Sequence, residues 1–258
     1  MSEQIEITGN QENNNNAKWQ PFVGTETEKL IEYKGFVNSQ GKIDDSGDKI
    51  IDETYRILEM CSNPNDNPTA ETGLVLGYVQ SGKTLSFTTL TAMARDNNFQ
   101  IVIIIAGTST PLSEQSYKRM LKDLQIDERR DRKWKIIKNP KNQNHLNSIQ
   151  DSLEKWQDPT LPREKCSTVL ITVMKQTHRL QNLINVMRNL DLSNVPTLII
   201  DDESDQASLN TRARANARAG ESVNEGDAST IYRRINSLRE VFPHHTLLQY
   251  TATPQANL

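Results

Sequence analysis

The chain has 258 residues, a formal net charge of −3 and only 35% hydrophobic residues. This small negative charge argues against binding nucleic acid through bulk positive charge, and no apolar run approaches the roughly 20 residues that a membrane-spanning helix needs. The polar start lacks the apolar core of a signal peptide, and Cys61 and Cys166 show neither metal-ligand nor redox spacing, so we expect a cytoplasmic protein with reduced thiols.

The first part of the chain is predicted to lie outside the main fold. Residues 1–20 are polar and Asn-rich and predict a disordered leader. Residues 21–72 predict a helical extension, in which residues 46–61 have helical spacing and Ser46 or Asp48 as the N-terminal cap.

From residue 73 to residue 258, short apolar runs alternate with helical patterns. The predicted strands are residues 73–77, 100–107, 134–138, 167–174, 196–202 and 245–254, and the predicted helices are residues 83–98, 111–124, 144–156, 178–190 and 229–242. Continuously apolar strands between helices are typical of a parallel sheet that is covered on both faces, so we predict one layered α/β domain. Residues 206–228 are polar and are predicted to form a mobile loop or insertion.

The stretch "GYVQSGKT" fits the P-loop pattern G-x-x-x-x-G-K-[ST] between a predicted strand and a predicted helix. In this pattern backbone N–H groups surround the phosphates, Lys83 pairs with the β- and γ-phosphates, and the Thr84 hydroxyl binds Mg²⁺. We therefore predict a P-loop NTPase of the RecA-like type with ATP and Mg²⁺ as cofactors. The predicted nucleotide-binding residues are Gly77, Gln80, Ser81, Gly82, Lys83 and Thr84.

The acidic run "DDESD" follows the predicted strand 196–202, where ligands bind in open α/β sheets. Asp202 is predicted to anchor the metal and Glu203 to activate the attacking water, with Lys83 completing the catalytic set. Asp201 is a candidate for the last position of the strand, which leaves the register of the acidic run open by one residue. An acidic helix cap is the competing interpretation.

The motif order resembles the superfamily 2 helicases. "DESD" resembles their DEAD-type box, and "TSTPLSEQ", "VLITVMKQTHRL" and "TATP" stand where that superfamily has its nucleic-acid and coupling motifs. The resemblance implies nucleic-acid contacts, to DNA more than to RNA, at Thr110, Gln115 and Lys175. It also implies coupling of the ATP site to movement through Asp205, Thr251 and Thr253.

Within that superfamily, "GYVQSGKT", "IIDDESDQASLNT" and "YTATPQANL" resemble the ATPase portion of the Z-one-domain proteins over residues 73–258. That family is predicted to act in bacterial conflict and restriction-like systems and carries an endonuclease assignment. The resemblance implies a helicase- or translocase-like ATP hydrolase. It also implies that a second RecA-like lobe, with its arginine finger, and an effector or nuclease come from elsewhere. We assign no cleavage to the residues present.

Two other functions remain open from the residues alone. An ATP-dependent regulatory switch or assembly module would act through a protein partner without translocation, and a P-loop small-molecule kinase is a weaker alternative. The basic run 129–138 is predicted to be either a solvated turn or a phosphate-contacting patch. Arg212, Arg214 and Arg218 are interpreted as solvated loop charges, and the histidines as structural.

Overall fold

The structure is a computed structural model that describes residues 6–8, 19–76, 83–202, 204 and 230–251. The strands are β1 (Glu6–Thr8), β2 (Ala70–Leu76), β3 (Ile101–Ile105), β4 (Trp134–Lys138), β5 (Thr168–Val173), β6 (Thr197–Asp201) and β7 (His245–Thr251). The helices are α1 (Thr25–Tyr33), α2 (Asp45–Glu59), α3 (Lys83–Asp96), α4 (Thr110–Asp123), α5 (Gln143–Gln157), α6 (Thr177–Met187) and α9 (Thr230–Arg239), with a short 3₁₀ turn at Arg163–Lys165.

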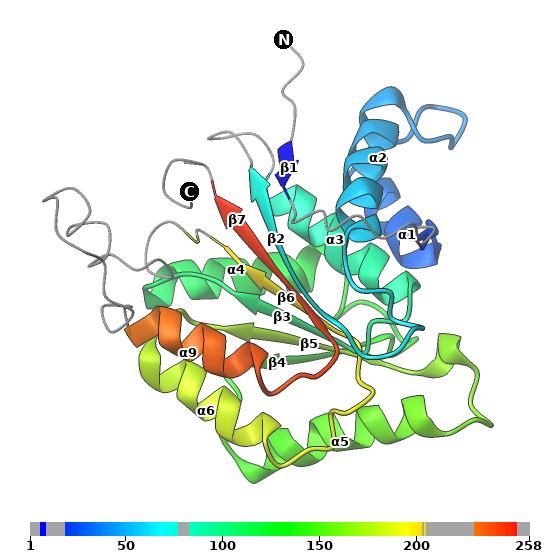
Figure 1. Ribbon diagram of the computed structural model, residues 1–258. Coiled ribbons are helices and arrows are strands. Elements are labelled where there is room, and N and C mark those ends of the chain that lie inside the picture. Colours follow the sequence, from blue (N-terminus) through cyan, green and yellow to red (C-terminus); the bar gives the residue numbers. More distant parts are fainter. Residues whose placement is uncertain (1–5, 9–18, 77–82, 203, 205–229, 252–258) are drawn as a thin grey trace, which may run out of the picture.

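One sheet runs through the molecule in the order β1-β2-β7-β6-β3-β5-β4. The six neighbouring strands β2, β7, β6, β3, β5 and β4 are parallel to one another. Strand β1 pairs antiparallel with β2 at one edge of the sheet. In Figure 1, α1, α2 and α3 cover one face of the sheet, and α5, α6 and α9 cover the opposite face. The predicted α/β fold with a mostly parallel sheet covered on both faces is confirmed.

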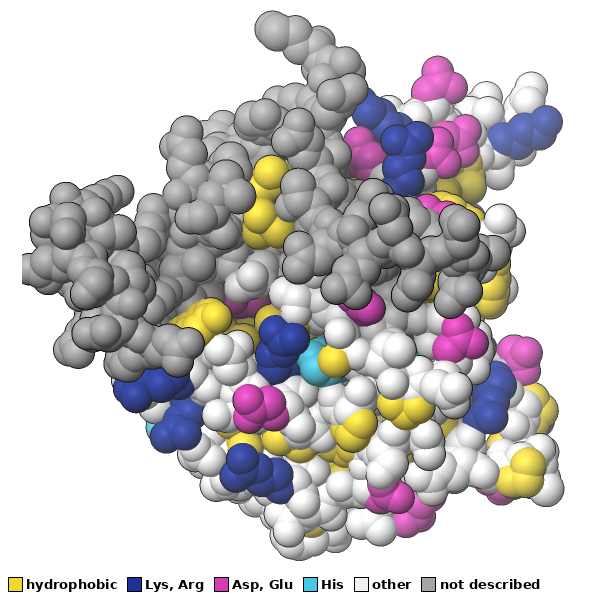
Figure 2. All heavy atoms as spheres, in the orientation of Figure 1, with side chains coloured by type: hydrophobic (Ala, Val, Ile, Leu, Met, Phe, Trp, Pro, Cys, Tyr) yellow, Lys and Arg dark blue, Asp and Glu magenta, His cyan; other side chains and the backbone are white. Residues whose placement is uncertain are grey.

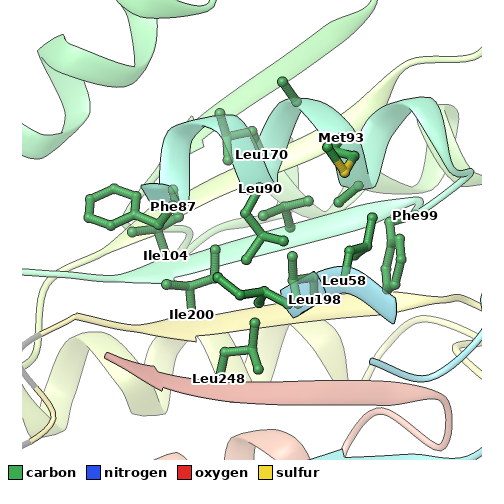
Figure 3. Close-up of a cluster of buried hydrophobic side chains, with 14 of the residues drawn as sticks. Leu58, Phe87, Leu90, Met93, Phe99, Ile104, Leu170, Leu198, Ile200 and Leu248 are labelled. Atoms are coloured by element: carbon green, nitrogen blue, oxygen red, sulfur yellow. The ribbon is translucent and has the colours of Figure 1, made fainter. Parts of the chain in front are cut away.

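Strand residues alternate between two hydrophobic clusters. Val102, Ile104 and Leu198 point to the cluster under α1 to α4, whereas Ile103 and Ile199 point to the cluster under α5, α6 and α9. Figure 3 shows the first cluster, in which Phe87, Leu90 and Met93 of α3 lie over Ile104, Leu198, Ile200 and Leu248 of the sheet. Because both faces are buried, every strand position can be apolar, which explains the continuous runs in the sequence.

The amino-terminal part differs from the sequence expectation in three ways. Within the segment predicted to be a disordered leader, Glu6–Thr8 form β1 by pairing with Leu74 to Leu76. Strand β2 begins at Ala70 rather than at residue 73. Helix α2 is capped by Asp44, not by Ser46 or Asp48: its Oδ1 accepts from the backbone N–H of Ser46 at 2.9 Å and of Gly47 at 2.8 Å.

Candidate functional site

The candidate site lies at the carboxyl edge of β2, β7 and β6, which are neighbours in the sheet. Leu76, the last residue of β2, pairs with Thr251, the last residue of β7, and Asp201 of β6 pairs with Gln249. Parallel strands end at the same edge, so Leu76, Asp201 and Thr251, the last residues of β2, β6 and β7, lie at one edge of the sheet.

Part of the predicted site falls outside the described residues. This holds for the P-loop residues Gly77, Gln80, Ser81 and Gly82, for Glu203 and Asp205 of the acidic run, and for Thr253. Helix α3 begins at Lys83, within the sequence that fits the P-loop pattern, so the backbone at Lys83 and Thr84 forms its first turn. The helix therefore points its positive amino end at the edge of the sheet where the acidic run emerges.

Tyr250 of β7 links the first turns of α3 to the acidic run. Its hydroxyl lies 3.4 Å from Oγ of Ser86 on α3, and its ring meets Phe87 edge-on with centroids 6.0 Å apart. Burial raises the pKa of Tyr250, and the negative charge of Asp202 raises it further.

Asp201 and Asp202 have different environments. Asp201 is the last residue of β6 and is completely buried, and its Oδ1 lies 2.7 Å from Nζ of Lys175. The next residue, Asp202, is partly exposed, and its backbone N–H donates to the carbonyl of Ile105 at 3.0 Å. The carboxylate of Asp201 is thus engaged by Lys175 inside the protein, whereas the side chain of Asp202 is partly exposed.

Lys175 has a different place from the one that the sequence predicts. Its side chain is 1% exposed. Besides the pair with Asp201, its Nζ donates to the carbonyl of Asp202 at 2.5 Å, and its backbone N–H donates to the carbonyl of Gly107 at 3.0 Å. The expected contact of Lys175 with nucleic acid does not agree with this placement, because the ammonium group points into the protein. The residue instead joins the ends of β3, β5 and β6.

The other two predicted nucleic-acid contacts lie on α4. Thr110 and Gln115 are exposed, and Pro111 occupies the first turn of the helix. The turn before α4 depends on Gly107, whose φ is +70° and where a Cβ would lie 2.6 Å from the backbone N of Ser113. Only glycine fits there without strain, so α4 begins directly beside the end of β3.

Arg119 is a site residue that sequence reasoning missed. Its Nη1 donates to Oγ1 of Thr84 at 2.6 Å, across 35 positions of sequence. The residue belongs to no motif, and its helix is amphipathic like many others, so no local signal pointed to it. The contact brings a guanidinium group to the hydroxyl that the P-loop pattern assigns to Mg²⁺.

Part of the basic run 129–138 is structural. Arg129 donates two hydrogen bonds of 2.6 Å to the carboxylate of Glu26, and Trp134 Nε1 donates a third at 2.9 Å. Burial alone would raise the pKa of Glu26, but Arg129 and Trp134 outweigh burial and lower it. Arg129 and Trp134 therefore hold α1 to the loop before β4 and are not arranged as a phosphate patch.

The described residues show no sign of a reactive thiol, a metal-binding cluster or a membrane-spanning helix. Cys61 and Cys166 are free and buried, and burial raises the pKa of the Cys61 thiol to about 12. Among the described residues, no group of three or more His, Cys, Asp or Glu side chains could hold a metal ion by itself. Within the same residues, no helix is long and apolar enough to cross a membrane. Figure 2 shows acidic and basic side chains interspersed over the described part of one face.

Comparison with known proteins gives little beyond this geometry. No family model and no curated protein matches the chain. A solved structure of the DUF1998 helicase MrfA, bound to DNA and AMPPNP, is similar at a TM-score of 0.43 and 11% identity. The match covers 97% of this chain but only 29% of the helicase chain, so this chain spans less than a third of that protein. A likeness this distant decides nothing about function.

Proposed function

We propose that this chain is the ATP-binding first lobe of a nucleic-acid-dependent ATPase of the helicase or translocase type. The observation that carries the proposal is the strand order β2-β7-β6. The strand that leads into the P-loop sequence and the strand that leads into the acidic run flank a single strand that ends at Thr251. A phosphate-binding turn and an acidic metal anchor at one sheet edge are the two parts that nucleotide hydrolysis requires.

The residues present fit Mg²⁺·ATP by their chemistry. A threonine hydroxyl and a carboxylate are hard oxygen donors of the kind that Mg²⁺ takes, and Thr84 in the first turn of α3 and Asp202 directly after β6 would supply them. Bound Mg²⁺ would neutralise charge on the phosphates. The backbone of Gly77, Gln80, Ser81 and Gly82 would cradle these phosphates together with Lys83, and Glu203 would accept the proton of the attacking water.

We further propose that the same edge couples nucleotide state to movement. Thr251 is buried at the end of β7, beside the last residue of β2. A change at the phosphates would reach this strand end through the residues that follow β2 and β6, with Thr253 and Asp205 as its other members. Thr110 and Gln115, both exposed on α4, would contact the nucleic-acid backbone.

The wider setting rests on the family resemblance alone. It favours DNA over RNA, a second RecA-like lobe and an effector or nuclease outside these residues, and a bacterial defence or restriction-type system. The alternative, an ATP-dependent switch that acts through a protein partner, shares the nucleotide site and differs in having no nucleic-acid track.

The decisive experiment measures binding and turnover separately. Fluorescent ATP with Mg²⁺ should bind the wild-type chain, and Lys83→Ala should weaken binding at least roughly tenfold, since it removes a cation from the phosphates. ATP turnover is then measured with and without single- and double-stranded DNA, beside Glu203→Gln. Turnover that DNA stimulates and Glu203→Gln abolishes supports the proposal. Binding without DNA-dependent turnover favours the switch, and absence of binding overturns both.

A further inference from the structure

Arg119 lies in the middle of α4, on the sheet face that α3 also covers. Its guanidinium group donates to Oγ1 of Thr84 at 2.6 Å, and the rest of the side chain is half-buried. A charged donor at this distance makes one of the stronger hydrogen bonds found in proteins. The side chain is therefore directed at the first turn of the helix that follows the P-loop.

The helix that carries Arg119 is fixed along its length. Met120, the next residue, is fully buried in the core. The buried carboxylate of Asp123 pairs with Nζ of Lys34 at 2.7 Å, and Glu114 forms an ion pair with Lys138 of β4. Because α4 is anchored on both sides of Arg119, the guanidinium reaches Thr84 from a rigid support.

The chemistry of the contact suggests more than a structural bond. A guanidinium carries five N–H donors in a planar fork that matches phosphate oxygens, whereas the Thr84 hydroxyl is a single acceptor. Thr84 is also the residue that would face Mg²⁺ and the β- and γ-phosphates of a bound nucleotide. A triphosphate at this place would offer Arg119 negatively charged acceptors next to its present partner.

We propose that Arg119 is a phosphate-contacting residue of the nucleotide site, supplied by α4 of the same lobe. The proposal rests on the function proposed above and adds a second cation to the one that Lys83 provides. Through Arg119, bound nucleotide would add one more contact to α4, the helix that also carries the exposed Thr110 and Gln115. Gln115 precedes Arg119 by four residues and so lies one helical turn away on the same face.

The test compares Arg119→Ala, Arg119→Lys and the control Lys122→Ala in the full chain. Lys122 is an exposed lysine on the same helix, so its removal changes the charge of α4 without touching Thr84. Binding of fluorescent ATP with Mg²⁺ should weaken at least roughly tenfold in Arg119→Ala, because a charged hydrogen bond is lost. Arg119→Lys should recover part of the loss, and Lys122→Ala should bind like the wild type.

Hydrogen exchange gives a second readout that does not depend on turnover. In the wild type and in Lys122→Ala, Mg²⁺·AMPPNP should slow exchange along α4, and in Arg119→Ala this protection should disappear at saturating nucleotide. Equal affinity of Arg119→Ala and wild type would overturn the proposal, and so would tighter binding, which would mean that Arg119 opposes the metal. If the wild type and Lys83→Ala bind equally poorly, the proposed function itself fails and this inference falls with it.

Discussion

Lys175 is the residue whose role in the structure departs most from its sequence context. A lysine after a strand in a helicase-like motif suggests a surface contact, yet its ammonium pairs with the buried Asp201 and with the carbonyl of Asp202. Burying two charges is costly unless they satisfy each other, which this pair does. We interpret Lys175 as the residue that holds the start of the acidic run at the sheet edge.

We predict that Lys175→Met lowers the free energy of unfolding by about 3–5 kcal/mol, because it leaves the carboxylate of Asp201 buried without its cation. Urea denaturation measures this loss. Lys118→Met, which replaces an exposed lysine of α4, should change stability by less than about 0.5 kcal/mol.

The double variant Lys175→Met/Asp201→Leu separates the loss of the ion pair itself from the cost of leaving the Asp201 carboxylate buried without its cation. It removes both charges and should recover much of the stability, since apolar replacements of buried ion pairs are often neutral. Equal effects of Lys175→Met and Lys118→Met would show that the buried pair contributes nothing.

At the scale of elements, the end of α3 caps the beginning of α1. Gly24, the N-cap residue of α1, has no side chain to bond the free N–H groups of the helix. The carboxylate of Asp96 accepts instead from the backbone N–H of Gly24, Glu26 and Thr27 at 3.2, 3.0 and 2.9 Å, and from the Thr27 hydroxyl at 2.8 Å. A Cβ at Gly24 would lie 2.6 Å from Cγ of Asp96, so the close approach requires glycine.

Asp96→Ala should therefore release α1 from α3. We expect a loss of about 1–2 kcal/mol in the free energy of unfolding, the range for removal of a helix cap, together with faster hydrogen exchange confined to α1. Asp127→Ala removes an exposed carboxylate elsewhere and should leave both unchanged. Uniformly faster exchange over all helices would contradict a local role for Asp96.

Elements of the fold were predictable to different degrees for physical reasons. Buried strands rich in β-branched residues, such as Ile101–Ile105, are recognisable from sequence because every position is apolar. The predicted strand 134–138 has the bounds that the structure gives it. Strand β1 was missed because three residues pairing at a sheet edge need no hydrophobic pattern, and the cap of α1 was missed because its acceptor lies about seventy positions away.

At the scale of the whole molecule, two buried histidines make stability depend on pH. His244 and His245 precede and begin β7, and burial lowers the pKa of both below the ordinary value of 6.5. Nδ1 of His245 lies 2.6 Å from the carbonyl of Phe242, and within the described residues its Nε2 has no hydrogen-bond partner. Protonation would place an N–H at Nε2 with no acceptor.

The sign of the effect follows from these lowered pKa values. Near and below the ordinary histidine pKa of 6.5 the unfolded chain binds more protons than the folded chain. The free energy of unfolding should therefore be highest above about pH 7 and should decrease as the pH falls through about 6.5. Urea denaturation across this range measures the slope. His245→Asn should reduce it, whereas His178→Gln, at an exposed position, should not. An unchanged slope in His245→Asn would contradict the assignment.

The candidate site was proposed from its motifs, and the structure adds side-chain contacts that the motifs do not show. Thr84 and Asp202 were chosen from sequence patterns, whereas the buried ion pair of Asp201 with Lys175 has no sequence pattern of its own. The contact of Arg119 with Thr84 could not be predicted, because helical spacing indicates which face of a helix a residue occupies but not which distant side chain it contacts. Contacts between residues far apart in the chain arise from tertiary packing and correspond to no local sequence pattern.

The antiparallel strand β1 has a practical consequence for anyone who purifies this protein. Glu6 lies opposite Leu76, and Thr251 lies opposite Leu76 on the other side, so Glu6 and Thr251 lie at the same edge of the sheet. Because Glu6 and Thr251 both lie beside the candidate nucleotide site, an affinity tag is best removed before any binding measurement, and a label on α5, on the opposite sheet face, is the safer reporter.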